Sequence, residues 1–335
     1  MHVWMPTIRG HSGSDVFVER LVAGLRLRGV NVTVEWFDRR YEFMPSILSS
    51  RRAPDGANVI HVNGLNGFAF RNHGLPLVVT EHHFVLDPGY RPYKSFLQHV
   101  YHRLVTGRAS IRSMKAADAL VVHSRFVAET LRAAGTHLEP TVAPLWVDLE
   151  HFVPGPPQSP AGGKMRLLFV GNTSRRKGFD VVVELARRLG DTVSISCTGG
   201  LRGQGGDGLP ENIRFLGRLS DADLVAAYQD TDVALVPSRY EGFGYAALEG
   251  MACGKPVLGF ACGSVEEIVD DGRSGLLYRV DDVDGLERGA RELALAPARR
   301  IEMGAAGRSD AERRFSPGIG IDTYLSVYRN VTRSA

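Results

Sequence analysis

The chain has 335 residues, of which 44% are hydrophobic and 23% are charged, and its formal net charge is +3 at pH 7. At about 150 residues per domain this length predicts two globular domains, and the composition excludes an intrinsically disordered chain. So small a net charge gives no indication of a nucleic-acid-binding protein. Only five of the 40 basic residues are lysines.

Cysteine content and the N-terminal segment bear on the compartment. Cys197, Cys253 and Cys262 form no CxxC pair, which predicts neither a metal cage nor a disulfide framework and fits a reducing compartment. The opening MHVWMPTIRG lacks the basic and apolar regions of a signal peptide. No apolar run approaches the roughly 18 residues of a membrane span. We expect a soluble, cytoplasmic protein.

Strand-like and helical patterns alternate along the chain. Amphipathic helices are expected, for example, at residues 16–28 and 180–189. Buried strands are expected at residues 31–37, 58–64, 75–83 and 118–124 in the first half, and at 165–171, 192–200, 213–217, 232–238 and 255–260 in the second. Such alternation predicts an α/β protein with parallel sheets covered by helices on both faces. Ligands of such sheets bind beyond the carboxyl ends of the strands.

A segment rich in proline and glycine, residues 148–163, divides the chain. We therefore predict an N-terminal Rossmann-like domain over residues 1–150, a linker over 151–163, and a second Rossmann-like domain over 164–315. A C-terminal helix within 316–335 is expected to pack back on the N-terminal domain. Two such domains enclose a cleft in which a ligand can bind.

The segment with the most candidate binding residues follows the predicted strand at 232–238. Gly242 and Gly244 allow backbone amides to approach a ligand, and the helix start behind them favours an anion. Glu241 and Glu249 are carboxylates that can accept hydrogen bonds from sugar or ribose hydroxyls. GFGYAA also fits a loose dinucleotide motif, but the acid expected about 20 residues later is missing. EGMACGK differs from a Walker loop in spacing and lacks its Ser or Thr.

Two further loops could face a phosphate. Arg175, Arg176 and Lys177 follow a predicted strand, and cations at a strand end suit a diphosphate, although a solvated surface loop fits the pattern equally well. Gly13 precedes the first predicted helix and could receive phosphate or sugar; an ordinary helix cap by Ser14 or Asp15 is the alternative.

Taken together, these motifs resemble the family 4 retaining glycosyltransferases, which adopt the GT-B fold. The likeness covers nearly the whole chain. It is strongest in EGFGYAALEGMACGKPVLGFACGSVEEIVDDGRSGLLY, where two glutamates are separated by seven residues. SRRKGFDVVVELA resembles the Arg-Lys-Gly loop of the family, PLWVDLEHFVP resembles the end of its N-terminal domain, and SGSDVFVERLVAGLRLRGVNVTV resembles its Gly-Gly-x-Glu loop. The resemblance implies two Rossmann-like domains whose parallel sheets face each other across a cleft.

The resemblance also implies roles for single residues. Arg176 and Lys177 would neutralise the donor diphosphate, and Glu241 would contact the donor sugar beside Gly242 and the backbone amides near Phe243, Gly244 and Tyr245. Glu249 would hold the ribose, with the base near Arg218 and Leu219. His82, next to His83, matches the family histidine facing the donor sugar; a structural strand-end histidine is the alternative. Ser12 and Asp15 replace the usual Gly and Glu of the first loop, and Asn172 replaces an arginine for which Arg175 can substitute.

The sequence contains fewer residues that indicate an acceptor site or a metal site than residues that indicate a donor site. His61 and Asn63 end another predicted strand and could touch the acceptor, as could Asp15. No His, Cys and Asp set has zinc spacing. Asp221-Ala-Asp223 looks like the metal-binding DxD of the other glycosyltransferase fold, but Ser220 and Asp221 suit a helix cap better. We expect no metal and no cofactor besides the nucleotide-sugar co-substrate.

Residues 88–117 are basic and contain no Asp or Glu. Seven apolar residues follow helical spacing and form a stripe: Tyr93, Phe96, Leu97, Val100, Tyr101, Leu104 and Val105. The stripe either packs on the N-terminal sheet with the cations in water, or meets an anionic acceptor or a membrane surface.

The sequence thus predicts a retaining, metal-independent glycosyltransferase that moves a sugar from a nucleotide-diphosphate sugar to a hydroxyl acceptor. The acceptor would be lipid-linked or phosphorylated, in the synthesis of cell-envelope glycans, glycolipids or other glycoconjugates, with peripheral contact at the inner face of the membrane. The alternatives are a GT-B-fold sugar-nucleotide epimerase or phosphorylase, and a non-catalytic nucleotide-sugar-binding module. A nicotinamide oxidoreductase is more distant.

Overall fold

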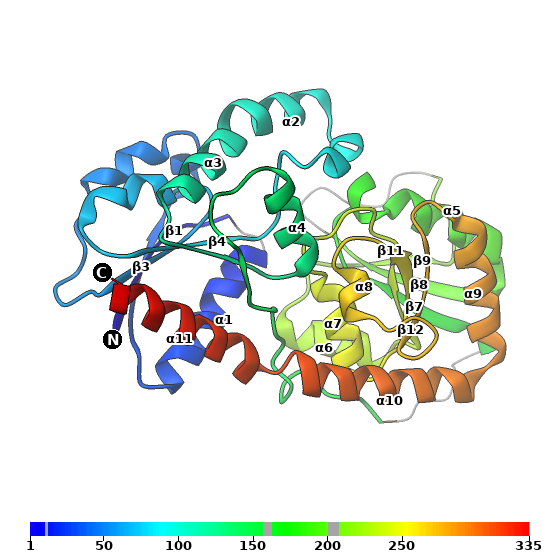
Figure 1. Ribbon diagram of the computed structural model, residues 1–335. Helices are drawn as coiled ribbons and strands as arrows, with labels where there is room; N and C mark the ends of the chain where they lie inside the picture. The colour runs from blue at the N-terminus through cyan, green and yellow to red at the C-terminus, as the bar shows by residue number, and fades with distance from the viewer. Residues whose placement is uncertain (11–12, 157–162, 200–207, 335) are drawn as a thin grey trace. The chain divides into compact units, whose positions relative to one another are not determined.

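The computed structural model describes residues 1–10, 13–156, 163–199 and 208–334. Part of the predicted linker, residues 157–162, lies outside this description. The chain divides into two compact units: unit 1 comprises Met1–Leu145 and Pro317–Ala335, and unit 2 comprises Trp146–Ser316 (Figure 1). Each unit contains one parallel six-stranded sheet with helices packed against it. The predicted α/β class is confirmed.

The sheet of unit 1 has the strand order β2-β1-β3-β4-β5-β6. Its strands are β1 (His2–Ile8), β2 (Asn31–Phe37), β3 (Val59–Asn63), β4 (Leu77–Glu81), β5 (Ala119–Val122) and β6 (Thr141–Val142). Buried runs in the sequence predicted β2 to β5, whereas β1 was not predicted. Residues 3–8 of β1 are all buried, and the strand lies between β2 and β3.

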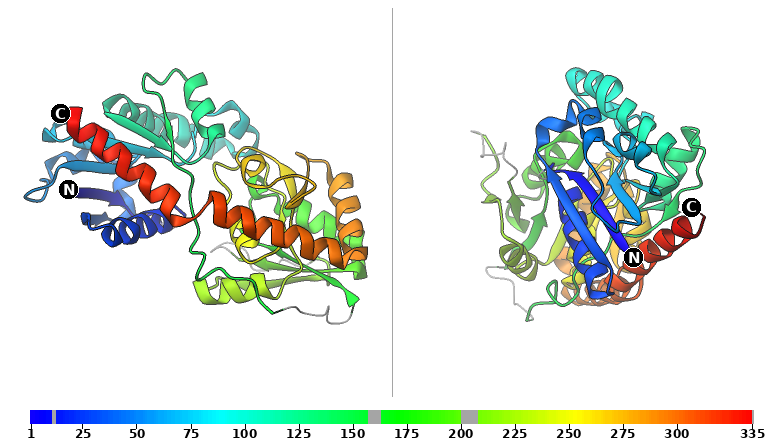
Figure 2. Two further views of the ribbon diagram at one scale, coloured as in Figure 1. Left: turned by 60° about the horizontal axis from the view of Figure 1, so that its bottom comes forward. Right: turned by 90° about the vertical axis from the view of Figure 1, so that its left-hand side faces the viewer.

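The helices of unit 1 are α1 (Gly13–Leu27), α2 (Phe96–Tyr101), α3 (Gly107–Ala116), α4 (Arg125–Ala133) and α11 (Pro317–Ser334). Although α11 ends the chain, it lies beside α1, as Figure 2 shows. A methyl group at Gly24 of α1 would lie 2.1 Å from the Ile321 side chain of α11, so the missing side chain permits the close approach. Shorter helical turns occur at Arg39–Glu42, Pro45–Ser50, Gly67–His73, Pro88–Tyr93 and His102–Thr106.

Buried hydrogen bonds attach α11 to the sheet of unit 1. The hydroxyl of Tyr328 lies 2.7 Å from Nδ1 of His61, and Nε2 of His61 lies 2.7 Å from the Thr80 hydroxyl. The Tyr324 hydroxyl is 3.1 Å from the same Thr80 oxygen. His61 is 0% exposed, so its side chain presents no surface to an acceptor. The structure thereby contradicts the acceptor hypothesis for His61, which packs and hydrogen-bonds within the unit instead.

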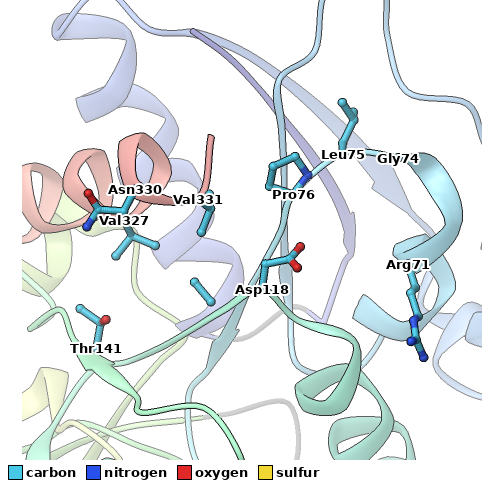
Figure 3. Close-up of a pocket in the computed structure, with 10 residues that line it drawn as sticks. Arg71, Gly74, Leu75, Pro76, Asp118, Thr141, Val327, Asn330 and Val331 are labelled. Atoms are coloured by element: carbon cyan, nitrogen blue, oxygen red, sulfur yellow. The ribbon is translucent and has the colours of Figure 1, made fainter. Parts of the chain in front are cut away.

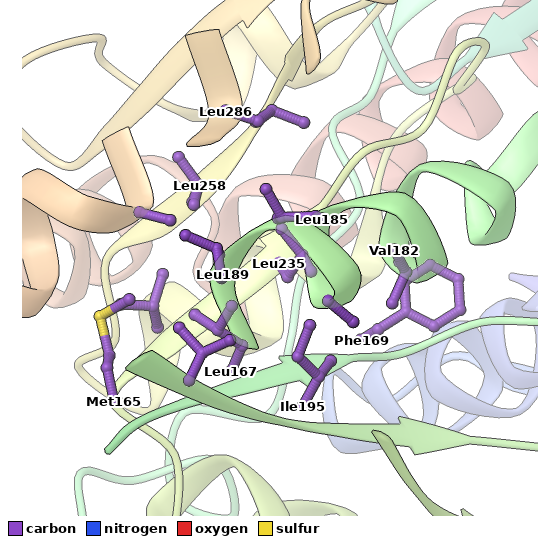
Figure 4. Packing of buried hydrophobic residues seen from close by; sticks show 14 of the residues in the cluster. Met165, Leu167, Phe169, Val182, Leu185, Leu189, Ile195, Leu235, Leu258 and Leu286 are labelled. Atoms are coloured by element: carbon purple, nitrogen blue, oxygen red, sulfur yellow. The ribbon is translucent and has the colours of Figure 1, made fainter. Parts of the chain in front are cut away.

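The sheet of unit 2 has the order β12-β11-β10-β7-β8-β9. Its strands are β7 (Met165–Phe169), β8 (Val193–Thr198), β9 (Ile213–Gly217), β10 (Val233–Val236), β11 (Val257–Ala261) and β12 (Gly275–Arg279). Its helices are α5 (Phe179–Leu189), α6 (Asp221–Gln229), α7 (Tyr245–Ala252), α8 (Val265–Ile268), α9 (Val283–Leu295) and α10 (Pro297–Arg314). Leucines and valines of β7, β10, β11 and α5 meet in its core (Figure 4).

Residues 88–117 form the outer part of unit 1, where α2 lies at the edge of the unit in Figures 1 and 2. None of the seven stripe residues is buried, and Phe96 and Leu97 are each 79% exposed. Phe96, Leu97 and Leu104 are exposed, whereas Tyr93, Val100, Tyr101 and Val105 are half-buried. The stripe is therefore not a single face packed on the sheet, and that interpretation of the segment is wrong for its exposed members. A π-helical turn at His102–Thr106 also interrupts the regular α-helical spacing. Among the described residues, no helix combines the length and apolarity needed to span a membrane.

Candidate functional site

Three loops of unit 2 follow neighbouring parallel strands at the same edge of the sheet. Residues 170–178 follow β7, residues 237–244 follow β10, and residues 262–264 follow β11. The carboxyl ends of parallel strands meet at one edge, which is where ligands of such sheets bind. The backbone joins two of these loops, because the Arg239 amide donates to the Arg176 carbonyl over 2.8 Å.

A cluster of charges lies at this edge. Nζ of Lys177 donates to Oε2 of Glu241 over 2.5 Å, and the Arg176 guanidinium lies 3.7 Å from the same carboxylate oxygen. Arg176 also donates to the Tyr240 carbonyl over 3.0 Å. These three side chains are 14–25% exposed, so they are held in place but remain accessible. The structure thus brings Arg176, Lys177 and Glu241 together, as the sequence predicted.

Two glycines allow the backbone conformation of the loops that carry this cluster. Gly178 has φ +78°, and a Cβ there would lie 2.0 Å from the Pro237 carbonyl oxygen. Gly244 has φ +102° and precedes the first residue of α7. Any other residue would strain both positions, and at Gly178 it would also collide with the backbone of the neighbouring loop. The start of α7 therefore lies directly behind Glu241, where the positive end of the helix dipole favours an anion.

The sequence analysis missed Arg239, which holds the cationic loop. Its side chain is 5% exposed and donates to Asp180 over 2.6 and 2.8 Å, to Asp281 over 2.5 Å and to the Arg175 carbonyl over 2.7 Å. Burial opposes the charge, but the bonds to Asp180 and Asp281 outweigh it and raise the pKa of Arg239. Arginine can serve all these acceptors because its guanidinium carries five N–H donors.

The remaining donor-site residues that were predicted in unit 2 lie on separate elements. Glu249 is buried in the middle of α7, with the Tyr228 hydroxyl 3.3 Å from its Oε2. Arg218 and Leu219 follow β9 and precede α6, and Arg218 is exposed. Phe243 and Tyr245 flank Gly244, with ring centroids 5.8 Å apart. Contacts of these residues with ribose, base or sugar remain predictions.

Asp221 and Asp223 belong to a helix start. The Ser220 hydroxyl accepts a hydrogen bond from the Asp223 amide and donates to its carboxylate over 2.7 Å. This arrangement caps α6, as expected for Ser220. In the parts of the chain that are described, no three His, Cys, Asp or Glu side chains come together in a way that could hold a metal ion.

The corresponding edge of unit 1 carries histidines. His82 follows β4 and His123 follows β5, and Nε2 of His123 lies 3.0 Å from Nδ1 of His82. Nε2 of His82 lies 3.2 Å from Oδ1 of Asn63, at the end of β3. Asp15 is buried in α1, where it accepts from the Gly10 amide over 3.1 Å. His82, Asn63, Gly13 and Asp15 therefore all lie at carboxyl strand ends or the helix start beyond β1; Ser12 lies outside the described residues.

Burial shifts the pKa values of the histidines and of a glutamate at or near this edge. It lowers the pKa of His82 to about 4, against the opposing influence of Asp15, and the pKa of His61 to about 3. The pKa of His123 is also lowered well below its usual value, chiefly by burial. Burial raises the pKa of Glu81 to about 7, although a hydrogen bond from Ser110 opposes the shift. With these lowered pKa values, His61, His82 and His123 are neutral at pH 7.

Unit 1 also contains a cavity of about 620 Å³, which lies away from these histidines. Pro76, Asp118 and Thr141 line it at the starts of β4, β5 and β6, together with residues of α11 such as Asn330 (Figure 3). Because the strands are parallel, this is the sheet edge opposite His82 and His123. The cavity therefore does not belong to the edge where the predicted site residues lie.

Two family models match this chain. "Glycosyl transferases group 1" matches residues 156–310, and "Glycosyltransferase Family 4" matches residues 36–151. A D-inositol 3-phosphate glycosyltransferase of Arthrobacter sp. (strain FB24) is 31% identical over 298 residues, covering 78% of this chain and 68% of that protein. A GDP-mannose-dependent monoacylated alpha-(1-6)-phosphatidylinositol monomannoside mannosyltransferase of Corynebacterium glutamicum is 31% identical over 236 residues, covering 62% of this chain and 61% of that protein.

Solved structures agree in fold. A sucrose-phosphate synthase from Thermosynechococcus elongatus superposes with a TM-score of 0.83 at 20% identity, covering 99% of this chain and 100% of that one. The HepE protein of Anabaena in complex with UDP-glucose gives a TM-score of 0.75 at 15% identity, covering 98% and 99%. Both confirm the predicted GT-B fold.

The chain belongs to the family 4 glycosyltransferases. Its matched part spans about two thirds of the length of the curated relatives named above.

The anchoring role of Arg239 leads to a stability prediction. Arg239→Met should lower the free energy of unfolding by about 1–3 kcal/mol, because the Arg175 carbonyl and two carboxylates lose their donor; the half-exposed carboxylates can be rehydrated, which limits the loss. Urea denaturation measures the change. Arg214→Met, at an exposed position on β9, is the matched control and should change the stability by less than about 0.5 kcal/mol. Equal effects of the two variants would contradict the anchoring role.

Proposed function

We propose that the charge cluster of unit 2 binds the diphosphate of a nucleotide-sugar donor, and that the enzyme transfers the sugar to a hydroxyl acceptor with retention of configuration. The observation that carries the proposal is the position of Arg176, Lys177 and Glu241 beside the start of α7. The cations and helix amides suit the diphosphate, and Glu241 suits sugar hydroxyls. Membership of family 4 supports the retaining outcome.

In the proposed reaction the nucleoside diphosphate leaves as the acceptor hydroxyl attacks on the same face of the sugar. The bond from the anomeric carbon to the diphosphate oxygen breaks, the bond to the acceptor oxygen forms, and a donor phosphate oxygen takes the acceptor proton. Arg176 and Lys177 stabilise the negative charge that develops on the departing diphosphate. Lys177 is bonded to Glu241, so donor binding redirects this ammonium group from the carboxylate towards phosphate.

The cationic cluster supplies the charge that a divalent ion supplies in other transferases, and we therefore propose a metal-independent reaction with no cofactor besides the donor. The names of the relatives, which contain an inositol phosphate and a phosphatidylinositol mannoside, support a phosphorylated or lipid-linked acceptor. We propose that the reaction belongs to cell-envelope or glycolipid synthesis at the cytoplasmic side of the membrane. An epimerase would turn over donor with no acceptor, and a binding module would bind donor with no turnover. A phosphorylase would use inorganic phosphate as the acceptor.

Substitution of the cluster tests the donor site. Lys177→Ala should lower turnover by roughly 10²–10³-fold because a positioned cation stabilises the leaving phosphate, and Glu241→Ala should behave likewise. Donor-dependent release of nucleoside diphosphate is measured with UDP-glucose and with GDP-mannose. Lys164→Ala is the control, since this exposed lysine pairs with Asp191 on the same unit. Near-full activity of either cluster variant at saturating substrate would contradict the assignment.

Metal independence has its own test. Activity should persist in excess EDTA, because Arg176, Lys177 and the start of α7 provide the positive charge within the protein. The same nucleotide-release assay measures it. Complete loss that manganese restores would instead favour metal binding at Asp221 and Asp223.

A second proposal concerns the exposed apolar side chains of residues 88–117. We propose that this surface contacts an anionic membrane that carries the acceptor. Phe96, Leu97 and Leu104 are 79%, 79% and 50% exposed. Arg91, Arg103, Arg108, Arg112 and Lys115 of the same segment are exposed as well. Exposed apolar side chains among cations fit an anionic lipid surface, to which each nearby cation contributes about 1 kcal/mol.

The membrane proposal is tested by co-sedimentation with vesicles. The protein should bind vesicles with roughly 30% phosphatidylserine, a composition similar to an anionic leaflet, better than vesicles of pure phosphatidylcholine. High salt should weaken this binding because it screens the charges. Replacing Phe96 and Leu97 by Ser should reduce binding severalfold by removing apolar contacts. Leu295 and Ile301, 87% and 71% exposed on unit 2, give the matched double-Ser control. Equal, negligible binding to both vesicles would exclude the membrane contact.

A further inference from the structure

In unit 2, the loop after β11 holds the loop that carries Glu241. Ser264, the last residue before α8, is 0% exposed. Its hydroxyl donates to the Phe243 carbonyl over 2.5 Å and lies 3.2 Å from the Glu241 carbonyl. Its backbone amide donates to the same Glu241 carbonyl over 3.3 Å. One buried serine therefore contacts the carbonyls on either side of Gly242.

The two donors of Ser264 divide between these carbonyls. A hydroxyl carries a single proton, and the Phe243 oxygen is its closer acceptor. The Glu241 oxygen has the backbone amide as its donor, and this bond does not depend on the serine side chain. Replacement of Ser264 by alanine therefore releases the Phe243 carbonyl and leaves the backbone contact in place.

The hydrogen bond to Phe243 also fixes the direction of the next amide. The peptide bond between Phe243 and Gly244 is trans and planar, so its C=O and N–H groups point in opposite directions. Because the carbonyl is held by Ser264, the Gly244 N–H points away from Ser264. Gly244 directly precedes α7, so this N–H lies at the positive end of the helix dipole, where an anion is favoured.

We propose that Ser264 is a positioning residue of the donor site, which directs the Gly244 N–H towards the diphosphate of the nucleotide sugar. This role rests on the proposed function for the identity of the ligand, whereas the direction of the peptide follows from the hydrogen bonds of Ser264. Glycine populates positive and negative φ with similar ease, so Gly244 alone does not prevent rotation of the peptide. A rotated peptide would present the Phe243 oxygen in place of the N–H, and a carbonyl oxygen cannot donate to phosphate.

Ser264 is itself attached to a well-packed element. Val265 and Ile268 of α8 are 0% exposed, and the Arg314 guanidinium of α10 donates to the Ile268 carbonyl over 3.3 Å. A Cβ at Gly244 would lie 3.5 Å from the side chains of Val265 and Ile268. The helix that follows Ser264 therefore packs against the residue whose amide Ser264 directs.

Selective labelling observes this peptide directly. Phe243–Gly244 is the one Phe-Gly step in the sequence, so protein labelled with ¹³C-carbonyl phenylalanine and ¹⁵N-glycine gives a single carbonyl–amide cross-peak in NMR. In Ser264→Ala the Phe243 carbonyl resonance should shift because its donor is lost. Ser274→Ala is the control, since Ser274 is also 0% exposed but precedes β12, at the opposite edge of the sheet. An unchanged resonance in Ser264→Ala, or an equal shift in both variants, would overturn the proposal.

Inorganic pyrophosphate tests the contact with a diphosphate. Added to the unsubstituted protein, it should shift the Gly244 amide resonance, because the N–H then donates to a phosphate oxygen. Ser264→Ala should need an about threefold higher pyrophosphate concentration for half-saturation, whereas Ser274→Ala should not differ from the unsubstituted protein. If pyrophosphate shifts other glycine resonances and leaves that of Gly244 unchanged, the proposed contact is wrong.

Turnover separates positioning from stability. Both serine variants should lower the melting temperature, since each loses a buried hydrogen bond. Ser264→Ala alone should lower kcat, by roughly tenfold, because negative charge grows on the diphosphate in the transition state. Its KM for the donor should rise only about threefold. Nucleotide release from UDP-glucose and GDP-mannose measures both constants, and equal kcat values of the two variants would show a merely structural role.

The outcomes also distinguish this role from the proposed function. If neither pyrophosphate nor either nucleotide sugar shifts a glycine resonance or raises the melting temperature, the donor site and the Gly244 contact fail together. If both donors are turned over and Ser264→Ala behaves like the unsubstituted protein, only the positioning role fails. The donor site at Arg176, Lys177 and Glu241 then stands.

Discussion

The parallel direction of every strand is the constraint on which both candidate sites depend. In each unit all six strands end at one sheet edge, so loops that are distant in sequence meet there. In unit 2 this brings residues 175–177 next to residues 239–241, about 64 residues further along the chain. In unit 1 it brings Asn63, His82, His123 and Ala143 into one hydrogen-bonded row. An antiparallel strand in either sheet would carry its loop to the opposite edge and break the set.

The arrangement of loops at one sheet edge does not by itself hold the positive charges of unit 2 close together. Arg175, Arg176 and Lys177 are consecutive, and their mutual repulsion disfavours a fixed loop unless other groups fix the backbone. Arg239 does so by hydrogen-bonding the carbonyls of Arg175 and Arg176 through its side chain and its amide. Gly178 then lets the chain turn directly against Pro237. The backbone is thus anchored by buried contacts, while the Arg176 and Lys177 side chains remain accessible.

The sequence analysis succeeded where the signal is local. Buried runs predicted most strands, and the spacing of Glu241 and Glu249 indicated the family. It missed β1 because an apolar N-terminal run has no pattern that distinguishes a central strand from other uses. It missed Arg239 because the partners of an arginine, here Asp180 and Asp281, are not visible from neighbouring letters. His61 illustrates the opposite error: a polar residue at a strand end was read as accessible, whereas α11, distant in sequence, covers it and bonds to it.

The two sheet edges also differ in charge, and this difference has chemical consequences. Unit 2 presents cations beside a helix start, and an anion there meets a favourable field. Unit 1 presents histidines that burial keeps neutral at pH 7, so its edge offers hydrogen bonds with little attraction for phosphate. Charged histidines would attract anions to the unit 1 edge, whereas neutral rings can donate and accept hydrogen bonds without that attraction. Burial of the unit 1 histidines thus determines the charge of this edge as well as its packing.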